Sequence, residues 1–335
     1  MAISCLSVQL VTEEKKKNKN ELPLTCACRK PPSSRCQLPL KGCTFRPGTR
    51  SRKAACGKRR PVSGQAKTTP HEINDMTETG EIFTKIDKII ETVDQFKTEP
   101  LFSDEKNKRQ NKIVSKIPND NEILKTLSYL IAYSQNSNSE IVEQVLKSGK
   151  FDTAFNDFKI EEVIKLNPCD IADNHWNSIK GIRQQAKLFH IVSLARKIKN
   201  IGSFADILNQ TNIPKSIKTQ NDIDDFWNGF DQLLNTLKNN KIPFFQSTTS
   251  LLHFLLDIGY DCVKPDLVVM KVAKKLNIVD NETGDKNFRR TVKFIQEYSV
   301  DRQIRPSIVD FYFLIDEGQM GAKKFVKPEF YNRTI

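Results

Sequence analysis

The sequence predicts an all-α fold for the body of the chain. Apolar residues recur three and four positions apart, the spacing of one buried helix face, in segments 82–96, 122–133, 139–146, 160–166, 188–198, 223–237 and 291–298. Helix-starting residues support this interpretation, as with Asp120 or Asn121 before Glu122. Sustained alternation of apolar and polar residues between turn dipeptides is missing from the sequence, so we expect no sheet. Charged and asparagine-rich stretches at 98–119, 209–221 and 280–287 are expected to be loops.

Basic charge is concentrated at the N-terminus. Residues 1–80 hold 16 Lys and Arg against 6 Asp and Glu, whereas the remaining residues hold 37 against 34. Segment 29–60 has no helical period and little apolar surface to bury, so we predict that residues 1–80 form a disordered basic tail. Such a tail can attract nucleic acid by releasing counterions from phosphates. A nuclear or organellar address, or a leader without function, would explain the same composition.

Cysteine usage and apolar runs limit the class of protein. Six of the eight cysteines lie in the tail without a C-x-x-C pair, so we expect neither a metal site nor a cofactor. No apolar run approaches the length that spans a bilayer, and the apolar start at residues 3–11 is short for a secretory signal. We therefore expect no membrane partner and a cytoplasmic or nuclear location, with organellar targeting by the tail left open.

Segment 242–278 holds the most informative pattern. It begins with Ile242-Pro243, passes a polar tip, continues as an apolar helix ending near Gly259, and opens a second helix after Val-Lys-Pro-Asp. The lone carboxylate at that second opening belongs to Asp266. The residues of the tip are Gln246, Ser247, Thr248 and Thr249.

This order resembles the helix-hairpin-helix DNA glycosylases of the endonuclease III superfamily. In that family an L-P-G-V-G-x-x-T-A hairpin binds the DNA backbone through main-chain N–H groups, and an Asp beyond the next helix faces the sugar of a flipped-out nucleotide. On this pattern Thr249 falls on the Thr and Asp266 on the catalytic Asp. Both hairpin glycines are replaced, by Phe244 and Gln246, so the hairpin should be a weaker anion site.

Upstream segments extend the resemblance to residues 121–279. The segment from Leu130 resembles the family's L-x-S-x-Q-x-[ST] motif, with Gln135 at the position of the Gln. Gly181-Ile182 falls on the start of the family's G-[IL]-x-x-x-K-A motif. The spacing of Phe151, Phe155 and Phe158 resembles DNA-3-methyladenine glycosylase I in particular. The resemblance implies a two-lobed helical fold with a helix-hairpin-helix glycosylase core at 121–279, an N-terminal helix and linker at 81–120 packing with the C-terminal lobe, and C-terminal helices and a tail at 280–335.

The resemblance also implies an activity and a site. The expected activity is hydrolysis of the N-glycosidic bond of a damaged base flipped out of duplex DNA, with Asp266 as the catalytic carboxylate. An alkylated purine is the favoured substrate, because its positive charge weakens the glycosidic bond. An Asp after a Pro is also common at the start of a helix, so the alternative is that Asp266 only stabilises the helix N-terminus. The residues expected to bind DNA are Gln246, Ser247, Thr248, Thr249, Lys264 and Lys271, and those expected at the base pocket are Tyr133, Gln135 and Trp176.

Two departures from the family's pattern limit the expected activity and cofactors. Bifunctional members of the family attack the sugar with a hairpin lysine, and Thr248 occupies that position here, so base removal without strand cleavage is expected. The last cysteine, Cys262, precedes Asp266, so the family's four-cysteine iron–sulfur cluster is not expected. The expected partner is double-stranded DNA bound by a monomer. The alternative is a catalytically inactive helical module that binds DNA or protein on the same fold.

Overall fold

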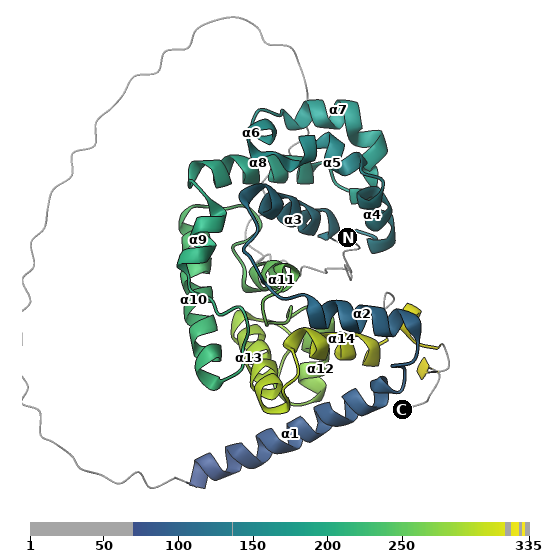
Figure 1. Cartoon of the computed structure of the whole chain (residues 1–335), viewed down its shortest axis with the longest axis vertical. Helices are drawn as coiled ribbons and strands as arrows, with labels where there is room; N and C mark the ends of the chain where they lie inside the picture. The colour runs from purple at the N-terminus through teal and green to yellow at the C-terminus, as the bar shows by residue number, and fades with distance from the viewer. Residues whose placement is uncertain (1–69, 136, 319–322, 328–329, 332–335) are drawn as a thin grey trace, which may run out of the picture. The chain divides into compact units, whose positions relative to one another are not determined.

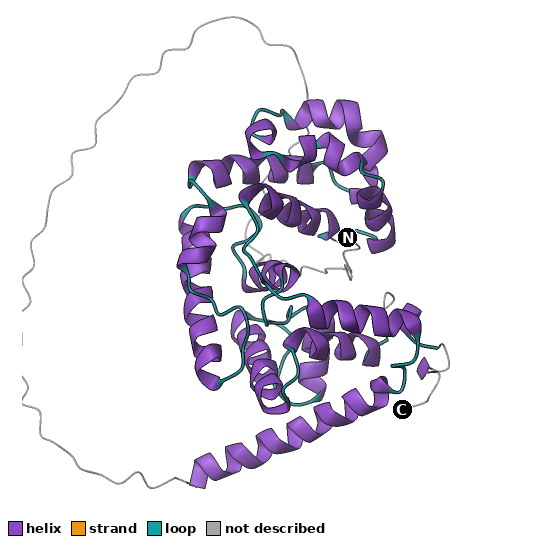
Figure 2. Cartoon of the chain, viewed as in Figure 1, coloured by secondary structure: helices purple, strands orange, loops and turns teal. Residues whose placement is uncertain are grey.

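The structure of the chain is a computed structural model that describes residues 70–135, 137–318, 323–327 and 330–331. Every regular element in these residues is a helix, which confirms the all-α prediction (Figure 2). The first seven α-helices are α1 Pro70–Asp94, α2 Pro100–Asn111, α3 Asp120–Tyr133, α4 Ser139–Lys147, α5 Lys150–Ala154, α6 Ile160–Val163 and α7 Pro168–Ile179. The others are α8 Ala186–Asn200, α9 Phe204–Gln210, α10 Gln220–Asn239, α11 Thr248–Ile258, α12 Leu267–Lys275, α13 Asp285–Arg302 and α14 Pro306–Asp316. Short 3₁₀ turns are η1 Asn156–Phe158, η2 Lys180–Ile182 and η3 Lys323–Phe325.

The basic tail predicted for residues 1–80 lies outside the described residues up to residue 69. Helix α1 begins at Pro70, within the segment that we expected to be tail. The start of α3 differs slightly from the expectation, because Asn119 is the capping residue. Its side chain accepts from the N–H of Glu122 at 3.1 Å, and the Glu122 carboxylate accepts from the N–H of Asn119 at 2.9 Å. This reciprocal pair is a capping box.

Helix α2 corrects the expectation of a loop at residues 98–119. Its sequence is mostly charged, so it shows no apolar period, and Phe102 is its fully buried side chain. Pro100 at the first helical position and the ion pair of Arg109 with Glu105, four residues earlier, favour the helix locally. Its position is fixed by tertiary contacts, which a sequence period cannot reveal.

The main core is built around α3 and α8, which pack side by side (Figure 1). Leu127, Ile131 and Leu194 are fully buried in it. The three aromatic residues singled out from their spacing join this core as one cluster with ring centroids 5.1–5.7 Å apart: Phe151, Phe155 and Phe158. Aromatic pairs at these distances stabilise a core beyond the area that they bury.

A second apolar cluster joins the beginning and the end of the described chain. Helices α2 and α14 lie against one another, and Phe102 packs against Phe311 and Tyr312 with ring centroids 5.1 and 5.9 Å apart (Figure 1). Val93 of α1 and Phe325 belong to the same cluster. Helix α14 also packs against α12, so this cluster places α2 beside the segment that carries Asp266.

Candidate functional site

Asp266 lies at the start of α12 with an extended backbone and caps that helix. One carboxylate oxygen, Oδ1, accepts hydrogen bonds from the backbone N–H groups of Val268 at 3.0 Å and Val269 at 3.2 Å. Its own N–H donates to the carbonyl of Lys264 at 2.8 Å across Pro265. An i to i+2 bond of this kind is a tight turn, which directs two alternate side chains toward the same place. The helix N-terminus also favours the ionised carboxylate.

Lys264 and Asp266 form a buried ion pair. Nζ of Lys264 lies 3.0 Å from Oδ2 of Asp266, and the two side chains are 7% and 8% exposed. Since Asp266 has few other routes to solvation at this depth, the ammonium is its counter-ion. A pair with so little exposure is costly to break from one side, because the remaining charge is left without a partner.

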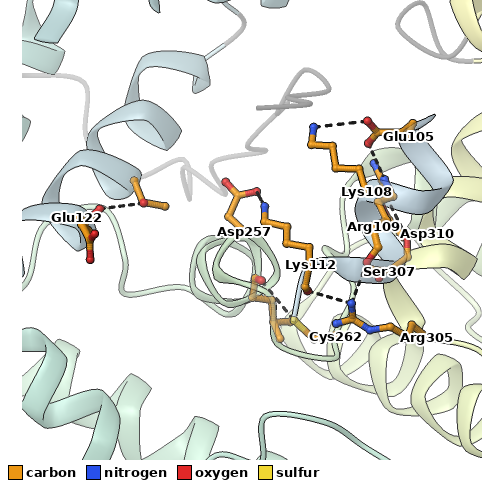
Figure 3. Close-up of polar contacts among 12 residues, drawn as sticks. Glu105, Lys108, Arg109, Lys112, Glu122, Asp257, Cys262, Arg305, Ser307 and Asp310 are labelled. Atoms are coloured by element: carbon orange, nitrogen blue, oxygen red, sulfur yellow. Dashed lines mark hydrogen bonds and ion pairs between the residues drawn. The ribbon is translucent and has the colours of Figure 1, made fainter. Parts of the chain in front are cut away.

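A small cleft borders this pair, with about 70 Å³ of space for water-sized groups, and it opens to solvent. Helices α2, α11 and α14 and the segment from Gly259 to Asp266 supply its walls. The residues that line it are Glu105, Lys108, Arg109, Lys112, His253, Leu256, Asp257, Gly259, Tyr260, Lys264, Asp266, Arg305, Ser307, Asp310 and Leu314. Figure 3 shows that several of these side chains are linked by polar contacts across α2 and α14.

Arg109 and Asp310 form the wall between α2 and α14. The Arg109 guanidinium lies 2.7 Å from Asp310 and 2.9 Å from Glu105 and also donates to the Ser307 carbonyl (Figure 3). Burial raises the pKa of Asp310 above its usual range, and the negative charge of Asp266 acts in the same direction. The carboxylates of α12 and α14 are therefore near enough to influence one another across the cleft.

Arg305 links several of the segments that line the cleft. It pairs with the Asp261 carboxylate at 2.7 Å and donates to the carbonyls of Arg109 and Gln110, at the end of α2, at 2.8 and 3.1 Å. It also donates to the Lys112 carbonyl at 2.9 Å (Figure 3). A further N–H donates to the carbonyl of Gly259, at the end of α11, at 3.2 Å. One guanidinium thus satisfies carbonyls at two helix C-termini, where a cation is favoured.

His253 faces the same cleft from α11 as a neutral imidazole. Its pKa lies well below the usual value, because burial disfavours the charged form and the charges of Lys264 and Lys112 add to that effect. The imidazole therefore adds no positive charge beside the Lys264–Asp266 pair at neutral pH.

The turn before α11 keeps a backbone conformation typical of glycine. Phe244 has a φ of 74°, in the left-handed region that glycine adopts without cost. The Gln246 amide donates to the Ile242 carbonyl at 2.8 Å, and Ser247 caps α11 by accepting from the N–H of Ser250. Phe244 thus adopts, with a large side chain, a backbone conformation that glycine favours.

The other predicted DNA-binding residues differ in how far they reach solvent. Thr248 is 3% exposed and donates its hydroxyl to the Asp285 carboxylate, whereas Thr249 is partly exposed. Lys271 is exposed on α12 and pairs with Glu317 at 2.5 Å. Lys264 is the member of the predicted set that lines the cleft beside Asp266.

The predicted base-pocket residues lie elsewhere. Tyr133 is 1% exposed at the end of α3, and Trp176 packs partly buried against the main core. Gln135 follows in the turn with a φ of 57°, and its buried Oε1 has no hydrogen-bond partner. These three residues are not among those that line the cleft at Asp266. A strained backbone and an unsatisfied buried oxygen in one residue are features of ligand-contacting positions.

Lys187 holds the turn that carries Gln135. Its ammonium, with three N–H donors, lies 2.8–2.9 Å from four acceptor oxygens: the carbonyls of Ala132, Ser134 and Ile182 and the Ser137 hydroxyl. The side chain is fully buried. The ammonium therefore ties both sides of the α3–α4 turn to η2.

The sequence did not reveal the part of the cleft formed by α2 and α14. Arg109 lies in a segment expected to be a loop, and Asp310 and Arg305 reach the cleft through contacts distant in sequence. A usable signal was Arg305-Pro306, because Pro at the first helical position marks the start of α14. His253, on α11, lines the cleft as well.

The described part of the chain holds no group of three His, Cys, Asp or Glu residues arranged to bind a metal ion. The six tail cysteines lie outside it. None of the helices within the described ranges is both long and apolar enough to cross a membrane. Comparison with protein-family models, with curated proteins and with solved structures finds no match for this chain.

Proposed function

We propose that this chain is a DNA glycosylase that hydrolyses the N-glycosidic bond of a damaged base extruded from duplex DNA. The observation that carries the proposal is the Asp266 carboxylate, fixed by α12 at the edge of an open cleft, with the polar turn 244–249 one helix away. A rigid carboxylate in a cleft stabilises positive charge that develops on a sugar as its base departs. The resemblance to the helix-hairpin-helix glycosylases assigns this role to the same residue.

The two ends of α11 suit the two tasks of such an enzyme. The helix has 11 residues, so the turn at its start lies roughly 16 Å along its axis from Gly259 at its end. Exposed Gln246 and Ser247 at the start can contact the DNA backbone while Asp266 faces the extruded sugar. Thr248 offers a hydroxyl, engaged by Asp285, where an imine-forming enzyme of this family has an amine. The proposed reaction is therefore base removal by water without strand cleavage.

The test is a base-release assay with methylated, deaminated and oxidised duplexes, scored by the appearance of abasic sites. We expect release from the alkylated substrate. Asp266→Asn should lower the rate by at least about 10²-fold and leave DNA affinity intact or higher, because the amide removes a negative charge. Asp224→Asn, an exposed carboxylate on α10 paired with Lys293, is the matched control and should keep the wild-type rate. Wild-type protein that releases no base from any of the duplexes would contradict the proposal.

A second candidate is a helical module that binds DNA without catalysis. It is favoured by the engagement of both Asp266 oxygens, one by the start of α12 and the other by Lys264. For this candidate Asp266 is a structural cap. Asp266→Asn would then lower folding stability, because the buried Lys264 ammonium loses its carboxylate partner, and base release would be absent from wild type and variant alike.

A further inference from the structure

Both carboxylate oxygens of Asp266 make polar contacts in the structure. Oδ1 accepts from two backbone N–H groups, and Oδ2 lies 3.0 Å from the Lys264 ammonium. A carboxylate that acts on a sugar presents one oxygen to it. Release of one of these contacts would therefore favour the proposed reaction.

The two sets of contacts differ in how easily they can be given up. The N–H groups of Val268 and Val269 belong to the first turn of α12 and cannot turn away without unwinding it. The Lys264 ammonium stands at the end of a flexible four-carbon side chain and lines the cleft itself. Oδ2 is thus the oxygen that can be released, and movement of Lys264 is what releases it.

We propose that Lys264 is a positioning residue that leaves Asp266 and binds a DNA backbone phosphate when the duplex enters the cleft. The phosphate replaces the carboxylate as the partner of the ammonium, and Oδ2 of Asp266 becomes available to the sugar. This inference rests on the proposed function and adds a coupling to it, since binding of the DNA backbone would switch the carboxylate into its active arrangement.

The charges around Lys264 suit such an exchange. Across the cleft the Asp310 carboxylate is held by Arg109 at 2.7 Å, and the charge of Lys264 acts on it as well. His253 beside it is neutral. Lys108 and Lys112 lie at the rim with exposed side chains, 41% and 43% accessible, in loose ion pairs of 3.6 Å. An incoming phosphate therefore meets exposed cations at the rim before it reaches the buried one.

Salt dependence of DNA binding tests the exchange without requiring catalysis. The probe is a duplex that contains a single tetrahydrofuran abasic analogue, and its affinity is measured by fluorescence anisotropy over a range of salt concentrations. Each phosphate neutralised by a cation contributes about 0.9 to the slope of log affinity against log salt. Lys264→Met should lower this slope by about 0.9, whereas Lys293→Met, which removes an ion-paired lysine outside the cleft, should leave it unchanged.

Lys264→Arg separates charge from disturbance of the fold. It keeps the cation and should therefore keep the slope. An unchanged slope for Lys264→Met, an equal fall for Lys293→Met, or a lowered slope for Lys264→Arg would each overturn the inference. If the slope falls as expected while no duplex loses a base, the exchange stands and the glycosylase proposal fails. Absence of any binding to the duplex would refute both.

Discussion

The ammonium of Lys187 donates a 2.8 Å hydrogen bond to the carbonyl oxygen of Ala132, in the last turn of α3. The same ammonium serves the Ser134 carbonyl, so a lysine of α8 takes the place of the backbone donors that α3 lacks at its end. A fully buried lysine is rare unless its donors are satisfied, and here four oxygens surround it.

Lys187→Met should therefore destabilise the protein by about 3 kcal/mol. The methionine retains the volume but leaves buried carbonyls without a donor, and each such group costs about 1–3 kcal/mol. The measurement is urea unfolding followed by circular dichroism. Lys199→Met, an exposed lysine of the same helix paired with Glu161, is the control and should change stability by less than about 0.5 kcal/mol. Equal losses of unfolding free energy for the two substitutions would show that the buried contacts of Lys187 do not stabilise the protein more than an exposed ion pair.

Gly259→Ala should destabilise the protein by about 2 kcal/mol. Gly259 has a φ of 101°, and an added Cβ would lie 2.8 Å from the carbonyl oxygen of Lys112. Gly284→Ala separates the two causes, because Gly284 has a φ of 96° but an added Cβ there meets nothing within 4 Å. Thermal unfolding should rank Gly259→Ala below Gly284→Ala, and the reverse order would contradict the close approach.

Arg305→Met should cost about 3–5 kcal/mol, because it leaves the buried Asp261 carboxylate unpaired and frees carbonyls at the ends of α2 and α11. Arg305→Lys should recover only part of the loss, since an ammonium cannot make the spread of contacts that the guanidinium makes. Chemical denaturation measures both. Hydrogen exchange provides a local check, because amides of α2 should lose protection first if Arg305 anchors that helix.

Glu317→Gln should lose its effect on stability in acid. Burial acts to raise the pKa of Glu317, but hydrogen bonds and charges from Lys271 and Lys275 outweigh it and leave the pKa below its usual value of 4.5. A carboxylate whose pKa is lowered by folding stabilises the protein above its unfolded pKa, and the contribution disappears as pH falls through the folded value. Wild type should exceed Glu317→Gln by up to about 1 kcal/mol at pH 7, and the difference should shrink as pH falls below 4.5 in urea unfolding. A difference that stays constant from pH 7 into the acid range would contradict the ion-pair origin.

Helix α10 illustrates what the sequence predicts well. Its apolar period at 223–237 and the capping pair of Thr219 and Asp222 both describe local geometry, and the helix forms at Gln220–Asn239. Both signals arise within one stretch of chain. They need no knowledge of the partners that the helix will bury.

Helix α2 illustrates the opposite case. Its stability depends on Phe102 packing against Phe311 of α14 and on Arg109 reaching Asp310, contacts that join residues 209 and 201 positions apart. The candidate site divides in the same way. Asp266 and Lys264 could be singled out from the resemblance of segment 242–278 to the glycosylase pattern, but their ion pair and the facing wall of α2 and α14 emerge only from tertiary structure.

Arg305 and its carbonyl partner Arg109 lie 196 residues apart, and this separation bears on synthesis of the protein. During translation α2 leaves the ribosome early, while the guanidinium that closes its end is added much later. The main core around α3 and α8 can pack first, but the cleft lacks the wall formed by α14 until that helix has been synthesised. A chain truncated before residue 305 should therefore retain helices without a competent cleft, and the site should be among the last parts of the molecule to mature.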